Sequence, residues 1–156
     1  FSNKYGHFVA PDLFQEEVTM DCIFCKIVSG DIPSVRVYED DRVLAFMDIN
    51  PLNDGHLLII PKAHATTIHD IAEADFLAVM SATRKLAAAV QKALNPDGIN
   101  LMQLNGKAAN QVVPHLHVHI VPRWSGDRLT ISQWDIVPGD MEKIKSVGQQ
   151  IQKALG

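Results

Sequence analysis

Hydrophobic residues occur in short runs in the first half of the chain, at residues 35–40, 41–49 and 56–61. The runs are rich in β-branched and aromatic residues, and only a few turn-forming residues separate them. Because such connections are too short for a crossover helix, they predict neighbouring antiparallel strands. Two further strands are expected at residues 99–105 and 115–123.

Helical spacing of apolar residues predicts helices at residues 21–30, 71–94 and 140–155. The second is long and alanine-rich, and Asp70 with Glu73 is expected to form a capping box at its start. Strands in succession, with helices between and outside them, predict an α+β fold. We expect an antiparallel sheet of about five strands with one long and one short helix, followed by the helix of the tail.

The length of 156 residues fits a single domain, which we place at residues 21–128. Residues 1–20 are interpreted as an N-terminal extension or a cloning remnant and receive no role. Residues 129–156 are interpreted as a C-terminal tail that carries the last helix.

Charge and composition narrow the classes of function. The chain has 14 basic and 18 acidic residues, and the formal charge of -4 argues against a nucleic-acid partner. No apolar run approaches the ~20 residues of a membrane span, and two cysteines are too few for a disulfide scaffold. We therefore expect a soluble cytoplasmic protein with no membrane partner.

Three of the seven histidines alternate with aliphatic residues, at positions 115, 117 and 119. On a strand this spacing places the three rings on one face, with neighbouring rings about 6.6 Å apart and the outer two about 13 Å apart. Three rings so arranged cannot all bind one metal ion, whereas two neighbours can converge on a phosphate or a metal. The alternative is a solvated polar face or core histidines that bond to the backbone.

The chain resembles the histidine triad (HIT) superfamily in four ordered motifs: CIFCKI, FMDINPLNDGHLLIIPKAH, LNGKAANQVVP and HLHVHIVPR. The resemblance covers about residues 21–128 and is strongest to bacterial members of the Hint branch. It implies a fold that forms homodimers, so that dimerisation extends the sheet. It also implies binding of a purine nucleotide, similar to AMP, and hydrolysis or transfer of nucleoside monophosphate groups.

The resemblance assigns His117 as the nucleophile on the α-phosphorus of a nucleoside phosphoramidate or dinucleoside polyphosphate, through a covalent nucleotidyl-histidine. A neutral imidazole suits this role, because a backbone carbonyl that accepts from Nδ1 leaves the Nε2 lone pair for the substrate. His119 is expected to donate to a phosphate oxygen or to protonate the leaving group. Asn105 and Gln111 correspond to residues that lie near the phosphate.

By the same resemblance Asp48 binds the ribose hydroxyls, and Phe46 and Ile49 flank the base. An ordinary turn carboxylate and two core residues are the alternatives at these positions. Val112 stands where many relatives have Ser or Thr, so a hydroxyl near the phosphate is absent and backbone N–H groups have to serve instead.

Cys22 and Cys25 have the spacing of one corner of a tetrahedral zinc site. The resemblance supplies the other two ligands, His64 and His115, which implies one structural zinc ion per chain. Two buried reduced thiols without metal are the alternative. His56 is expected to hydrogen-bond behind the triad.

Three functions follow from these patterns. The first is a HIT-type nucleotide hydrolase that needs no cofactor for its chemistry. The second is a catalytically weak nucleotide-binding interaction module, and the third is a metal-sequestering protein.

Overall fold

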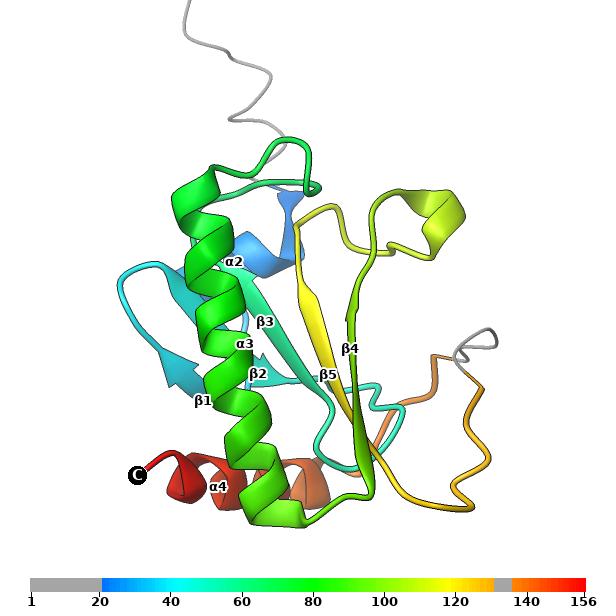
Figure 1. The fold of residues 1–156 in the computed structure, drawn as a ribbon. Coiled ribbons are helices and arrows are strands. Elements are labelled where there is room, and N and C mark those ends of the chain that lie inside the picture. Colours follow the sequence, from blue (N-terminus) through cyan, green and yellow to red (C-terminus); the bar gives the residue numbers. More distant parts are fainter. Residues whose placement is uncertain (1–20, 131–135) are drawn as a thin grey trace, which may run out of the picture.

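The computed structural model describes residues 21–130 and 136–156 and has one five-stranded antiparallel sheet (Figure 1). The strand order is β1-β2-β3-β5-β4. The strands are β1 Arg36–Glu39, β2 Val43–Met47, β3 Leu57–Pro61, β4 Gly98–Gln103 and β5 Val118–Arg123. The predicted α+β class and the five antiparallel strands are confirmed.

The two faces of the sheet are covered by different helices because side chains alternate along each strand. Ala45 and Ile59 belong to the larger core, beneath α3 (Glu73–Leu94) and α4 (Met141–Leu155). Phe46 and Leu58 point to the opposite face and pack with α2 (Ile23–Ser29) in a smaller core. The two-residue period of the sequence therefore determines which face each residue serves.

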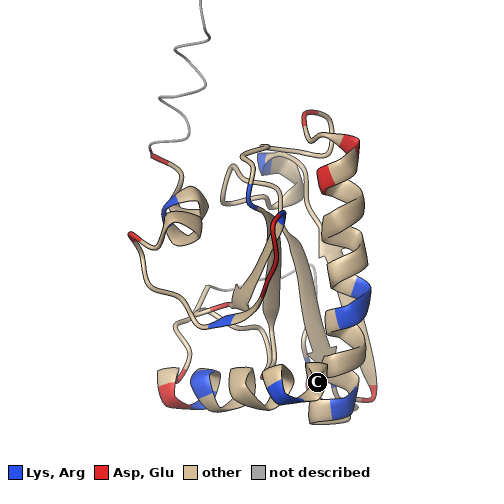
Figure 2. Cartoon of the chain, turned by 90° about the vertical axis from the view of Figure 1, so that its left-hand side faces the viewer, with Lys and Arg blue, Asp and Glu red and all other residues tan. Residues whose placement is uncertain are grey.

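Helix α3 begins two residues later than predicted, and the expected capping box is wrong. Its N-cap is Ala72, which contributes no side-chain hydrogen bond. The Asp70 carboxylate instead accepts from the backbone N–H groups of Thr66 and Thr67, which closes the turn before the helix. Acidic residues lie in the first turn of α3 and Lys92 in the last, an arrangement that favours the helix dipole (Figure 2).

The other two helices have terminal residues that match their ends. Helix α2 stops at Gly30, whose φ of 87° lies in the left-handed region that glycine adopts without strain. Helix α4 starts at Asp140, whose carboxylate accepts from the N–H groups of Glu142 and Lys143. Trp134 and residues 1–20 lie outside the described residues.

The histidine-rich strand is shorter than predicted, because β5 begins at Val118 rather than at His115. Pro114 has no N–H to donate to a neighbouring strand, and the backbone bends after it. The N–H of Leu116 donates to Ala65 O at 2.6 Å, outside the regular ladder. Only the last histidine of the triad therefore lies in a regular strand.

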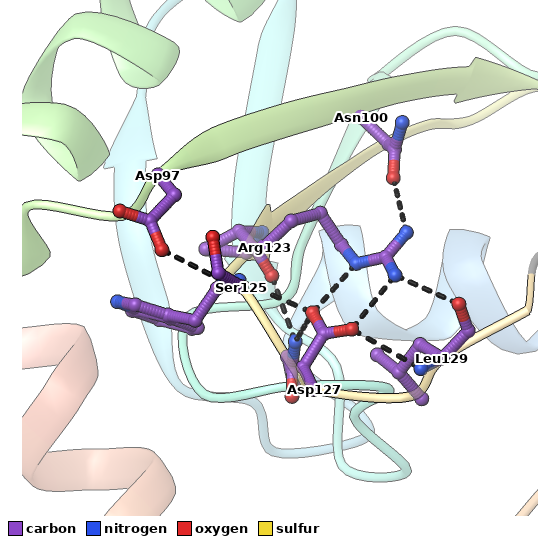
Figure 3. A network of polar contacts seen from close by, with 9 residues as sticks. Asp97, Asn100, Arg123, Ser125, Asp127 and Leu129 are labelled. Atoms are coloured by element: carbon purple, nitrogen blue, oxygen red, sulfur yellow. Dashed lines mark hydrogen bonds and ion pairs between the residues drawn. The ribbon is translucent and has the colours of Figure 1, made fainter.

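A polar network closes the turn after β5 (Figure 3). The Arg123 guanidinium donates to the Asp127 carboxylate, to Asn100 Oδ1 and to Leu129 O, each at 2.8 Å. Asp127 also accepts from Asn53, in the loop between β2 and β3. The network thus ties β4, β5 and two loops together. Among the described residues, no helix is both long and apolar enough to cross a membrane.

Candidate functional site

A cavity of about 1040 Å³ lies over the sheet face on which α2 packs. Its volume is at the upper end of the range for small-molecule sites. Seven of the predicted site residues line it: Phe46, Asp48, Ile49, Gln111, Val112, His117 and His119. Phe24, Lys107 and Ile136 are among the lining residues that sequence reasoning missed, and no spacing in the sequence gave a signal for them.

The surroundings of His117 favour one neutral tautomer of its ring. Its Nδ1–H donates to the carbonyl oxygen of His115 at 2.6 Å, which leaves Nε2 as the nitrogen with a lone pair. Burial lowers the pKa of His117, with only partial compensation from this hydrogen bond and from Asp48. A neutral ring with Nε2 unprotonated is the form that a nucleophile needs.

His119 receives its orientation from His56. The Leu52 N–H donates to His56 Nδ1 at 3.1 Å, so the His56 proton sits on Nε2 and is donated to His119 Nδ1 at 3.0 Å. His119 therefore carries its own proton on Nε2. Burial and the neighbouring imidazoles His117 and His56 lower the pKa of His119 to about 2, which keeps the ring neutral.

Asp48 lies at the end of β2, close to this pair of histidines. One carboxylate oxygen is 3.6 Å from His56 Nε2, and the other accepts from the N–H of Asn50. Asp48, His56 and His119 are close enough together for a metal site by distance alone. However, the Leu52 N–H keeps the proton on His56 Nε2, and a protonated nitrogen cannot bind a metal.

The two predicted phosphate-side amides are engaged within the protein. Gln111 lines the cavity, but its Nε2 donates to Thr66 O and Val113 O, and its Oε1 accepts from the Gly106 N–H. Its role is to tie two loops together. Asn105 is not among the lining residues, because its Oδ1 accepts from the Ile68 N–H and its Nδ2 donates to Gln103. A phosphate contact by Asn105 has no support in this geometry.

The predicted base-binding residues differ in exposure. Phe46 is 3% exposed and meets Phe24 edge-on, with ring centroids 5.4 Å apart, so it serves the small core as well as the cavity wall. Ile49 is 55% exposed and Val112 is 72% exposed. Two apolar side chains thus stand free at the rim of the cavity.

Four potential metal ligands lie close together: Cys22, Cys25, His64 and His115. Their donor atoms all lie within 4.8 Å of one another. Three Sγ to Nδ1 distances are 3.3, 3.5 and 3.6 Å. A tetrahedral zinc site with ordinary Zn–S and Zn–N bonds has S–N edges of about 3.5 Å. The spacing of these residues therefore fits zinc.

The protonation of the cluster agrees with a metal site. His115 Nε2–H donates to Pro61 O at 2.8 Å, which leaves Nδ1 with its lone pair toward the two sulfurs. Such an outer hydrogen bond is usual for a histidine that binds metal. Burial and the neighbouring Cys22 raise the pKa of Cys25 to about 12, so the thiol stays protonated in the absence of a cation. A bound metal ion would stabilise the thiolate.

The comparisons with known proteins agree on one family. The HIT domain family model matches residues 29–126. Adenosine 5'-monophosphoramidase hnt1 of Schizosaccharomyces pombe is 39% identical over 136 residues, which cover 87% of this chain and 99% of that protein. Adenylylsulfatase HINT3 of Arabidopsis thaliana is 43% identical over 113 residues, which cover 72% of this chain and 57% of that protein.

A solved structure gives the same result. The crystal structure of a Zn-bound histidine triad family protein from Mycobacterium smegmatis has a TM-score of 0.78 and 37% identity. The match covers 88% of this chain and 94% of that one. With the family model spanning well over half of its length, this chain belongs to the HIT domain family.

Proposed function

We propose that this chain hydrolyses or transfers the nucleoside monophosphate group of a purine nucleotide, with His117 as the nucleophile. The observation that carries the proposal is the 2.6 Å hydrogen bond from His117 Nδ1 to His115 O in a histidine that lines the cavity. Relatives named as an adenosine 5'-monophosphoramidase and an adenylylsulfatase support this class of reaction.

In the proposed reaction, His117 Nε2 attacks the α-phosphorus, and the bond from phosphorus to the leaving group breaks. The Nδ1–H bond to His115 O stabilises the positive charge that the ring acquires. His119 donates its Nε2–H to a phosphate oxygen and so stabilises the charge that develops there. Water then hydrolyses the nucleotidyl-histidine and releases the nucleoside monophosphate.

The nucleoside is proposed to bind on the side of the cavity formed by α2 and β2. Asp48, at the end of β2, accepts hydrogen bonds from the ribose hydroxyls. Phe46 in the wall and Ile49 at the rim contact the base. Phe24, which sequence reasoning missed, adds a further apolar surface on this side.

We further propose that Cys22, Cys25, His64 and His115 hold one structural zinc ion, as their spacing fits. When bound, zinc supplies no chemistry to the reaction, because four protein ligands leave it no open position. These residues connect the start of α2 to the segment that leads into β5. A homodimer is also proposed, supported by Leu101, which is 50% exposed on the edge strand β4.

The direct test measures both turnover and the intermediate. The wild type and the variants His117→Gln and His69→Gln are incubated with adenosine 5'-phosphoramidate and diadenosine tetraphosphate. We expect His117→Gln to lose more than about 10³-fold in kcat/KM, and His69→Gln, which alters an exposed histidine outside the cavity, to match the wild type. Mass spectrometry of wild type quenched in alkaline denaturant, which preserves the acid-labile P–N bond, should detect a nucleotidyl adduct on His117. Equal turnover by the wild type and His117→Gln would contradict the proposal.

A catalytically weak nucleotide-binding module is the second candidate. It is favoured by the engaged amide of Gln111 and by the 72% exposed Val112, which bring no side-chain donor to the phosphate. Tight binding of AMP without turnover of either substrate would select this alternative.

A further inference from the structure

A second cavity lies between the start of α4 and the loop that joins β2 to β3 (Figure 1). The residues that line it include Met47, Pro51, Gly139, Lys143, Ile144 and Val147. Its volume is about 250 Å³, and the proposed reaction does not use it. An engineered apolar cavity of about 150 Å³ takes up benzene. The second cavity is therefore large enough for one aromatic ring with a substituent.

The wall and the mouth of the second cavity differ in polarity. Met47, Ile144 and Val147 form an apolar wall, and all three side chains are buried. Asp54 and Lys143 also line the cavity, and their side chains are 48% and 60% exposed, which places them at its mouth. An apolar body therefore fits inside, with a polar group directed toward the mouth.

The charges at the mouth favour an uncharged molecule. Lys143 Nζ lies 2.9 Å from Asp54 Oδ2, so this cation already has its counter-charge. Asp140 also lines the cavity, and two carboxylates together oppose the entry of an anion. The N-terminus of α4 in turn opposes a cation. Since a carboxylate has further lone pairs, the mouth accepts a hydrogen bond from a neutral hydroxyl group.

The second cavity is connected to the proposed nucleoside site through the end of β2. Met47 lines the second cavity and also the larger cavity described above. Pro51 lines the second cavity as well, and the proposed ribose carboxylate, Asp48, lies between these two residues in the chain. The Gly139 N–H donates to Ile49 O at 2.9 Å. A molecule in the second cavity therefore packs against both ends of the short segment that carries Asp48.

We propose that the second cavity binds a small uncharged molecule of the phenol class, one aromatic ring with a hydrogen-bond donor, and that its occupant strengthens nucleotide binding. The effect on the nucleotide rests on the proposed function, whereas the binding site itself does not. An occupant packed against Met47 and Pro51 restricts the segment between them. Binding of the ribose at Asp48 then costs less conformational entropy.

The first test measures binding of p-cresol by calorimetry and by NMR of protein labelled at the isoleucine δ1 methyl groups. We expect one molecule per chain and a shift of Ile144, with none at Ile23, which lines only the larger cavity. The anion p-toluate, which has the same ring and methyl group, should bind at least about tenfold more weakly. Absence of binding, a shift of Ile23 in place of Ile144, or equal affinity for the two compounds would each overturn the proposal.

A matched pair of variants locates the site independently. Val147→Phe places a ring in the second cavity, whereas Val137→Phe makes the same change at a valine that is 61% exposed and lines neither cavity. We expect Val147→Phe to weaken p-cresol binding at least about tenfold and Val137→Phe to match the wild type. Unchanged binding by a folded Val147→Phe would place p-cresol elsewhere and overturn the proposal. If urea unfolding shows that Val147→Phe does not fold, the Ile144 shift in the wild type decides.

The second test measures the affinity for AMP with and without saturating p-cresol. We expect the Kd of AMP to fall about threefold, and linkage requires the Kd of p-cresol to fall by the same factor in saturating AMP. An unchanged or weakened affinity for AMP would overturn the proposed coupling. Absence of AMP binding altogether would contradict the proposed function, and the Ile144 shift would still test the second cavity.

Discussion

The buried neutral state of His56 predicts a specific dependence of stability on pH. Burial lowers the pKa of His56 from 6.5 to about 4, although the Asp48 carboxylate opposes this shift. The unfolded chain therefore takes up this proton at a higher pH than the folded chain does. The free energy of unfolding is thus unaffected by His56 above about pH 6.5, and decreases as the pH falls below that value.

The size of the effect follows from the two pKa values. At pH 5 the ring is mostly protonated in the unfolded chain and mostly neutral in the folded one. Because pH 5 lies about 1.5 units below the unfolded pKa of His56, the free energy of unfolding falls by about 2 kcal/mol between pH 7 and pH 5. Near pH 4 the folded chain also accepts the proton, and the loss levels off at about 3 kcal/mol.

Urea unfolding of the wild type, His56→Gln and His69→Gln at pH 7 and pH 5 measures this contribution. Glutamine keeps an amide that can donate to His119 but does not titrate, and His69 provides an exposed control. The wild type and His56→Gln share every other titrating group, so their comparison isolates His56, and His69→Gln shows the effect of removing an exposed histidine. We expect the wild type and His69→Gln to lose about 2 kcal/mol more than His56→Gln. Equal losses in the wild type and His56→Gln would refute the buried neutral state.

Three further predictions concern the metal cluster, the approach to α4 and the turn after β5. Cys22→Ala should abolish binding of one zinc ion per chain, measured by metal analysis, and lower the stability by several kcal/mol. A β-carbon at Gly139 would lie 2.7 Å from Cδ of the Pro51 ring, so Gly139→Ala should cost about 1–3 kcal/mol in urea unfolding. Arg123→Gln removes the donors that hold Asp127 and Leu129 O, and should increase proteolysis within residues 124–130.

The fold could be predicted largely because its signals are local. Alternation in β2 and β3 sorts residues between the two cores, and the apolar period of α3 extends over 22 residues. The end of α2 was also accessible, since Gly30 adopts a conformation that glycine favours. The start of α3 could not be predicted from the sequence, because Asp70 could cap either the helix or the turn before it. In the structure the Asp70 carboxylate accepts from the backbone N–H groups of Thr66 and Thr67, so it caps the turn and not the helix.

The site could be predicted as far as residue types and spacing determine it. The spacing placed His117 and His119 on one cavity, and the structure also brings Cys22 and Cys25 close to His64 and His115 as the resemblance implied. The hydrogen-bond partners of a side-chain amide could not be predicted, because they depend on how two loops pack together. Gln111 reaches Thr66, which lies 45 residues earlier in the chain, and nothing in the local sequence indicates that pairing.

His115 connects the candidate metal cluster to the candidate nucleophile within a single residue. Its ring faces Cys22 and Cys25, and Pro61 O holds the far side of that ring. Its carbonyl accepts from His117 Nδ1 and so determines which nitrogen of the nucleophile stays unprotonated. A regular strand would have set His115 along the same face as the other two histidines, about 13 Å from His119. The bend after Pro114 turns the ring toward the cysteines while the carbonyl remains available to His117. The departure from the predicted strand is therefore what allows one histidine segment to serve both groups.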